Sequence, residues 1–188
     1  MTTYYTADRS RQLQTGMALP LYQLPQNLYS AHLVQDMYDL SDLESMLADQ
    51  YPSGISLHGM RYLLNNENYL YDNGRPTTYV TYSPAVEVIF ENFRRAHFPE
   101  RPSRFQCVFG CKSPDETLRF FGDTSLPVFE ISTTKRVFIA DETFLKIGPN
   151  HLATHALAKK YWSGDVSTTP RLEVMIECEA QVGAKVRN

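Results

Sequence analysis

The segment TTPRLEVMIECEAQVGAKV, residues 168–186, decides the fold. A polar Ser/Thr loop runs into a predicted strand over 172–178, and AQVGAKV (180–186) predicts a second strand that closes the chain. At the strand period of two, one face is apolar and is predicted core: Leu172, Val174, Ile176 and Cys178. The other face carries Glu173, Met175 and Glu177. Either this face is solvated and keeps an edge strand soluble, or Glu173, at the start of the strand, has a role in chemistry.

Composition predicts a globular protein with a single domain over residues 1–188. Apolar residues make up 43% and charged residues 21%, with a net charge of −3. A mild acidic excess argues against a general polyanion binder, although a local basic patch stays open. The sequence has no apolar run of membrane-spanning length and no secretory leader, so we expect no membrane association. Three cysteines, an odd number, favour reduced thiols in the cytoplasm over disulfides.

The first half of the chain is predicted to begin with two short extended segments, to continue with helices and to end with a β-prone stretch. The extended segments are 2–6 and 17–24, and residues 30–70 are predicted to be helical but interrupted. Within them, Ser41 and Glu44 have the spacing of a capping box, and 54–67 forms a shorter amphipathic candidate. TTYVTYS, residues 77–83, is β-prone.

The second half is dominated by strands, separated by helices with clear start and stop signals. Helices are predicted over 83–98, 113–121 and 150–164, opened by Ser83, Ser113 and Asn150. Strands are predicted over 104–111, 126–132 and 136–141, before the two that close the chain. Helices come first and strands cluster late, so the predicted fold class is α+β.

Three segments in this order resemble the mono-ADP-ribosyltransferases, the toxin-like and phage-encoded group that cleaves NAD. They are the N-terminal strand TYYTADRS followed by LQTG, the central unit PSRFQCVFGCKSPDETLRFF, and the Ser/Thr loop that leads from KKYWSG into LEVMIE and VGAKV. The resemblance implies an ADP-ribosyltransferase-like split β-sheet core. Residues 26–80 have no counterpart in it and are interpreted as a helical insertion in the N-terminal half.

The resemblance assigns Glu173 as the catalytic carboxylate and NAD as the substrate. A carboxylate at the ribose stabilises the oxocarbenium-like centre that forms as nicotinamide leaves. For NAD binding it points to Tyr5, Thr6 and Arg9 on the first strand, and to Ser103 and Arg104 before the central strand. The alternatives are packing for the tyrosine and solvated surface charges for the arginines.

Two further aromatic residues, Tyr161 and Trp162, are candidates for the cleft wall, although a lone Trp is more often core. The chain also departs from the family pattern. It has no Ser-Thr-Ser motif, and Arg171 stands two residues before Glu173, where Glu or Gln is usual. The acceptor is therefore undetermined, with a protein expected and nucleic acid as the alternative.

A second hypothesis follows from these departures: a catalytically inactive interaction or inhibitor protein that binds a host protein through the helical insertion. We expect no metal site. His151 and His155 lie four residues apart on a predicted helix, but no third ligand accompanies them.

Overall fold

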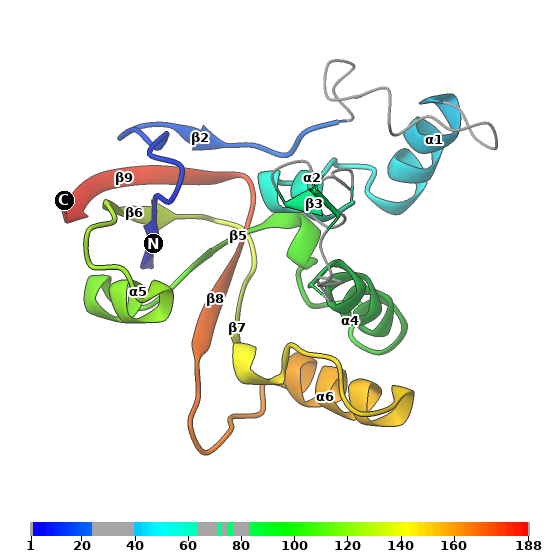
Figure 1. The fold of residues 1–188 in the computed structure, drawn as a ribbon. Coiled ribbons are helices and arrows are strands. Elements are labelled where there is room, and N and C mark those ends of the chain that lie inside the picture. The colour runs from blue at the N-terminus through cyan, green and yellow to red at the C-terminus, as the bar shows by residue number, and fades with distance from the viewer. Residues whose placement is uncertain (1, 24–39, 64–70, 73–74, 77–82, 188) are drawn as a thin grey trace.

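The computed structural model describes residues 2–23, 40–63, 71–72, 75–76 and 83–187, and these form a mixed α+β fold (Figure 1). The predicted fold class is therefore confirmed. The β-prone stretch 77–83 falls outside the described residues except for Ser83, where helix α4 begins. Ser41 lies inside the first helix rather than before it.

The larger sheet has four antiparallel strands in the order β1-β6-β9-β2. The strands are β1 (Thr3–Ala7), β2 (Ala18–Leu19), β6 (Val128–Ser132) and β9 (Ala180–Arg187). The smaller sheet has the antiparallel order β5-β8-β7, with β5 (Cys107–Gly110), β7 (Val137–Asp141) and β8 (Leu172–Glu177). β8 passes into β9 where the two sheets meet (Figure 1).

The two sheets part at the end of β5. Its last residue, Gly110, pairs with Val174 of β8, and the next residue, Cys111, pairs instead with Tyr5 of β1. A Cβ on Gly110 would lie 2.6 Å from the Tyr5 carbonyl oxygen, so only glycine permits this approach. Glu173, one residue before Val174, is thus placed where β8 loses its β5 partner.

The described helices lie around this divided sheet. They are α1 (Leu40–Gln50), α2 (Leu57–Leu63), α4 (Ser83–His97), α5 (Pro114–Phe121) and α6 (His151–Ser163). Helix α5 packs on β1, and α4 and α6 pack together beside β7 (Figure 1). The predicted stops and starts hold for α5 and α6, because Ser113 and Asn150 cap their first turns and Gly122 and Gly164 end them in the left-handed conformation.

β8 is the middle strand of its sheet, so the interpretation of 172–178 as an edge strand with a solvated face is wrong. Val174, Ile176 and Cys178 pack into the core between the sheets, as the apolar period predicts, whereas Leu172, also predicted to be core, is 36% exposed at the start of the strand. On the opposite face, Met175 is fully buried with Phe90 of α4 and Trp162 of α6. Because two helices cover that face, Glu173 is buried as well, with 4% of its surface exposed.

The proposed insertion, residues 26–80, is described only in part. Its described elements are α1, α2 and the two-residue strands β3 (Tyr71–Asp72) and β4 (Arg75–Pro76). A small core joins α1 and α2 to the turn Arg104–Gln106, through Leu47, Tyr51, Ile55 and Phe105. Among the described helices, none has the length and apolar character needed to cross a bilayer.

Candidate active site

Arg104 is the centre of a buried charged cluster in which four elements meet. Its guanidinium binds the carboxylate of Glu87 on α4 through two hydrogen bonds, Nε to Oε2 at 2.7 Å and Nη2 to Oε1 at 3.0 Å. Nη1 donates to Glu173 Oε1 at 2.5 Å and also to the hydroxyl of Tyr161 on α6. That hydroxyl donates in turn to Glu173 Oε1 at 2.6 Å. Arg104 and Glu87 are each 3% exposed, so the ion pairs are largely removed from water.

The local sequence explains why Arg104 points into this cluster. Arg104 opens a single 3-10 turn, Arg104–Gln106, whose cap is the Ser103 hydroxyl accepting from Phe105 N. The guanidinium lies against the ring of Phe109, 4.5 Å from its centroid. This packing and the two hydrogen bonds to Glu87 fix the orientation of the guanidinium, so Arg104 is a preorganised donor for Glu173.

Among the described residues, the cluster pairs one guanidinium with two carboxylates, a formal excess of one negative charge. Burial alone would raise the pKa of Glu87, but Arg104 and His58 outweigh it and hold that pKa at about 2. His58 Nε2 lies 3.4 Å from Glu87 Oε1, yet burial lowers the pKa of His58 and keeps the imidazole neutral near pH 7. Burial also raises the pKa of Tyr161 well above its usual value, so its phenol stays protonated as a donor.

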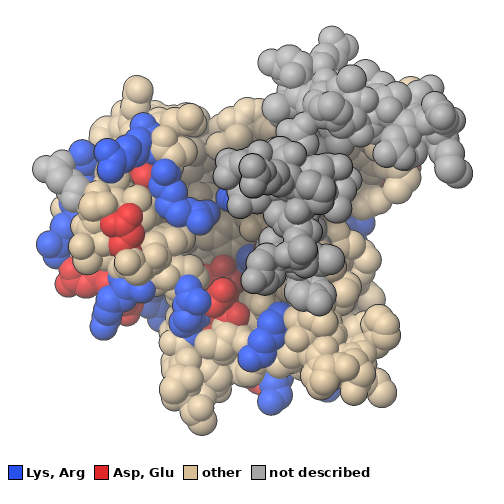
Figure 2. Space-filling view, in the orientation of Figure 1, with Lys and Arg blue, Asp and Glu red and all other residues tan. Residues whose placement is uncertain are grey.

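A cleft opens onto this cluster. A cavity of about 830 Å³ is lined by the acidic side chains of Glu87, Glu142 and Glu173 together with Arg104. A second cavity of about 560 Å³ adjoins it and shares its lining at Arg9, His58, Arg61, Phe109 and Phe121. Figure 2 shows a hollow in this face, with acidic side chains at its floor and basic side chains beside it.

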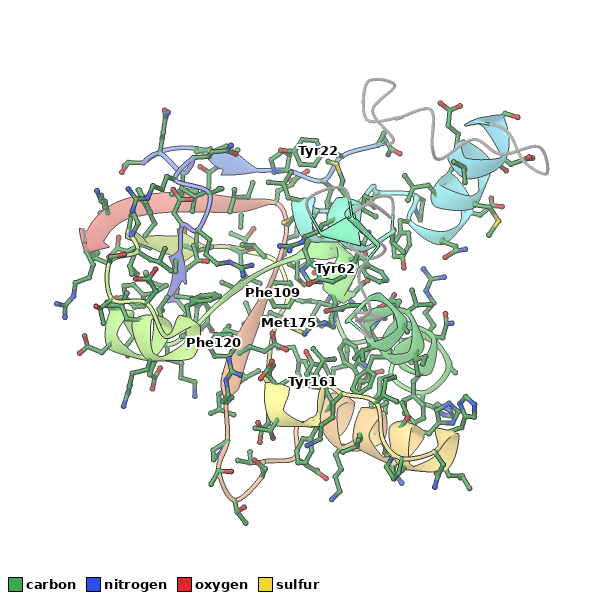
Figure 3. The ribbon with its side chains drawn as sticks, viewed as in Figure 1. Tyr22, Tyr62, Phe109, Phe120, Tyr161 and Met175 are labelled. Carbon is green, nitrogen blue, oxygen red and sulfur yellow. The ribbon has the colours of Figure 1, made fainter. Side chains whose placement is uncertain are left out.

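Aromatic rings from several elements turn toward the same region. In Figure 3, Phe109 of β5 and Phe120 of α5 lie near the place where the sheets part, and both line the larger cavity. The ring of His58 lies beside that of Phe109, with centroids 4.6 Å apart and planes tilted by 52°. The cleft therefore combines flat apolar surfaces with a few fixed charges, which is typical of small-molecule sites.

The loop that leads into β8 is anchored by Asp141, which is fully buried at the end of β7. Its carboxylate accepts from the backbone N–H groups of Thr143, Ser167 and Arg171, at 3.1, 2.7 and 3.0 Å. Burial would raise the pKa of Asp141, but these hydrogen bonds hold it at about 2. Asp141 thus fixes the backbone two residues before Glu173.

The structure brings four of the predicted site residues into the cleft. Arg104 and Glu173 line the larger cavity, Thr6 lines the smaller one, and Arg9 lines both. Arg104 is the anchor of Glu173 rather than a solvated surface charge.

Three predicted ligand-binding residues lie outside the cleft. Trp162 is wholly buried, stacks on Phe138 and donates its indole N–H to the Phe90 carbonyl at 2.9 Å, so it belongs to the core. Ser103 is a buried helix cap. Tyr5 lines neither cavity, because it alternates along β1 with Thr6, which faces the cleft.

Sequence reasoning missed Glu87, His58, Glu142 and the phenylalanines of the cleft. A signal existed for Glu87. It directly follows Val86 on the apolar stripe of α4, where a carboxylate needs a buried partner. Nothing in the local pattern indicated that this partner is Arg104, 17 residues further on.

Comparison with known proteins gives a family but no activity. No curated protein matches the chain. The sequence model of one family, described as "Protein of unknown function (DUF2441)", matches residues 4–188. The chain belongs to the DUF2441 family.

Proposed function

We propose that this protein is an NAD-dependent mono-ADP-ribosyltransferase that modifies a cellular or host macromolecule, with Glu173 as the catalytic carboxylate. One observation carries the proposal. Glu173 is held at the floor of a cleft, where the sheets part, by hydrogen bonds from Arg104 and Tyr161. Within the described part of the chain both bonds go to Oε1, which leaves Oε2 for a ligand in the cleft.

The excess negative charge of the cluster suits a reaction that develops positive charge. When the bond between nicotinamide and ribose breaks, the ribose becomes oxocarbenium-like and the hydrogen bond from its hydroxyl to a carboxylate strengthens. Arg104 and Tyr161 fix the carboxylate before the reaction, so little reorganisation is needed. Such a preorganised group contributes about a hundredfold or more in rate.

The cleft also offers the groups that a dinucleotide requires. The Arg9 guanidinium, at the junction of the two cavities, suits the pyrophosphate, since arginine binds phosphates in bidentate fashion. Phe109 and Phe121 at the same junction give flat faces for the nicotinamide or adenine ring. The three cysteines are free thiols, which supports action in a reducing compartment such as the cytoplasm.

Labelled NAD incubated with a cell lysate tests the proposal. The wild type transfers label to a macromolecule, and Glu173→Gln, which keeps the shape but removes the charge, does not. Glu177→Gln is the matched control, because Glu177 lies on the same strand but pairs with the half-exposed Arg136 away from the cleft. Labelling that survives in Glu173→Gln would remove this carboxylate from the mechanism.

Thermal unfolding separates the enzyme from the inactive interaction protein. NAD at a hundred times its dissociation constant adds about 2.7 kcal/mol to the free energy of unfolding. A melting curve that NAD leaves unchanged, together with no labelling, would favour a protein that acts only by docking on a partner.

A further inference from the structure

Three arginines of the larger cavity are paired with aromatic rings that line the same cavity. The Arg9 guanidinium lies 5.2 Å from the Phe121 ring centroid, that of Arg61 5.7 Å from Tyr62, and that of Arg171 4.6 Å from Phe120. The three arginines lie in the segment after β1, on α2 and in the loop before β8, and two of the three rings lie at the end of α5. Cations interleaved with flat rings are the surface that single-stranded nucleic acids bind, because phosphates meet the cations while bases stack on the rings.

The charge distribution supports the same ligand. The chain as a whole has a net charge of −3, yet five cations and three carboxylates line the larger cavity: Arg9, Arg61, Arg104, Lys146 and Arg171, against Glu87, Glu142 and Glu173. Figure 2 shows acidic side chains in the hollow and basic side chains at several places beside it. A polyanion can therefore contact the exposed side chains of Arg9, Arg61 and Lys146, whereas Glu87 and Glu173 are buried.

We propose that the acceptor of the transferred ADP-ribose is a base of a single-stranded nucleic acid, held by Arg171 and Lys146 with stacking on Phe120. This inference rests on the proposed function. Arg171 and Phe120 form a platform for a base at the rim. The Arg171 guanidinium, held by Glu142 at 3.2 Å and by the Phe120 carbonyl at 3.0 Å, lies 4.6 Å from the Phe120 ring centroid. Its remaining N–H groups can donate to a phosphate, because a guanidinium carries five donors.

The transfer balances with groups that line the cavity. The bond between C1′ of the ribose and nicotinamide breaks, and its electron pair leaves on nicotinamide. A nitrogen of the base forms the new bond to C1′ and loses its proton to the carboxylate of Glu142. Burial raises the pKa of Glu142 against the pull of Arg171, which makes it a better proton acceptor than an ordinary surface carboxylate.

Binding is tested with a fluorescent, mixed-sequence single-stranded oligonucleotide of about 20 nucleotides, by anisotropy over a range of salt concentrations. The wild type binds the single strand in preference to the same sequence as a duplex. Arg171→Gln makes the slope of log affinity against log salt shallower by about 0.7, the value for one lost cation on a single strand. Phe120→Leu weakens binding by about fivefold or more through lost stacking.

Arg187→Gln is the matched control. Arg187 and Arg171 side chains are both 53% exposed and each pairs with one carboxylate, but Arg187 lines neither cavity. Its substitution leaves affinity and salt slope unchanged. Equal effects of the two substitutions, equal binding of duplex, or no binding of the oligonucleotide would each overturn the inference. Unfolding curves establish that each variant is folded.

Transfer is tested with labelled NAD and the same oligonucleotide, followed by nuclease or protease digestion. The inference is confirmed if nuclease digestion releases the label and protease digestion does not. Label that is lost only on protease treatment overturns the inference while the transferase proposal stands. Oligonucleotide binding that needs Arg171 without any NAD cleavage would overturn the transferase proposal and leave a nucleic-acid-binding cleft.

Discussion

Arg104→Met removes the one cation that stands between two buried carboxylates, and we expect it to destabilise the protein by about 3–5 kcal/mol. Methionine fills much of the volume but leaves Glu87 and Glu173, 3% and 4% exposed, without the cation that both bind. The Tyr161 hydroxyl on Glu173 and the neutral His58 beside Glu87 do not replace that charge. Breaking a buried ion pair by removing one partner costs about this much. Arg104, with His58, holds the pKa of Glu87 at about 2 against the opposing effect of burial, which agrees in direction with this cost.

The predicted loss depends on pH with a definite sign. In the wild type the folded pKa of Glu87 lies below its unfolded value, so its contribution is complete above about pH 4.5 and is lost as pH falls toward 2. In Arg104→Met the same carboxylate has lost its cation, and burial raises its pKa. The variant therefore regains stability as pH falls from about 8 to 5. Over this range the difference in the free energy of unfolding between the wild type and the variant becomes smaller.

Urea and thermal unfolding of the two proteins give the measurement. For a chain of this length the predicted loss lowers the melting temperature by about 6–20 °C. Arg136→Met is the control, because Arg136 binds Glu177 through the same two-pronged geometry but is 53% exposed, and its loss costs less than about 1 kcal/mol. An equal cost for the two substitutions, or a loss for Arg104→Met that does not shrink at lower pH, would refute the reasoning.

Three more predictions concern the supports of the site. Asp141→Asn destabilises the protein by about 2 kcal/mol, because an amide cannot accept hydrogen bonds from all three backbone donors. In unfolding curves the loss of stability relative to the wild type becomes smaller as pH falls from about 4 toward 2, where the Asp141 contribution is lost. Gly59→Ala costs about 1–3 kcal/mol in urea unfolding, since its Cβ would lie 2.4 Å from the Phe105 carbonyl oxygen; an unchanged midpoint would contradict that contact. Burial, with the nearby Glu177, raises the pKa of Cys178 to about 12, so iodoacetamide modifies it slowly in the folded protein and rapidly in urea, as mass spectrometry can follow.

Local patterns predicted the elements of this fold well, since their causes are local. Ser113 with Pro114, and Asn150 with Gly164, mark helix ends through hydrogen bonds within a few residues. The alternation of β8 predicted which residues share a face, but not that α4 and α6 cover the face of Glu173. Coverage depends on tertiary packing, which a period of two cannot reveal.

The candidate site was predictable only in fragments. Glu173, Arg104, Arg9 and Thr6 were identified singly, and the structure brings all four to the cleft. The pairing of Arg104 with Glu173 joins residues 69 apart and passes through a 3-10 turn that has no strong sequence signal. Tyr161 and Trp162 were candidates for the cleft wall because they end the helix before the loop that leads to Glu173. Both are fully buried, and the Trp162 indole N–H finds its partner in the core.

The central claim is that the Glu173 carboxylate acts on the bond between nicotinamide and ribose, and the rate of nicotinamide release from NAD tests it most directly. The account predicts measurable release by the wild type and by Glu177→Gln, and release at least about a hundredfold slower by Glu173→Gln at saturating NAD. Release by Glu173→Gln at the wild-type rate, in protein that is folded, would contradict the account.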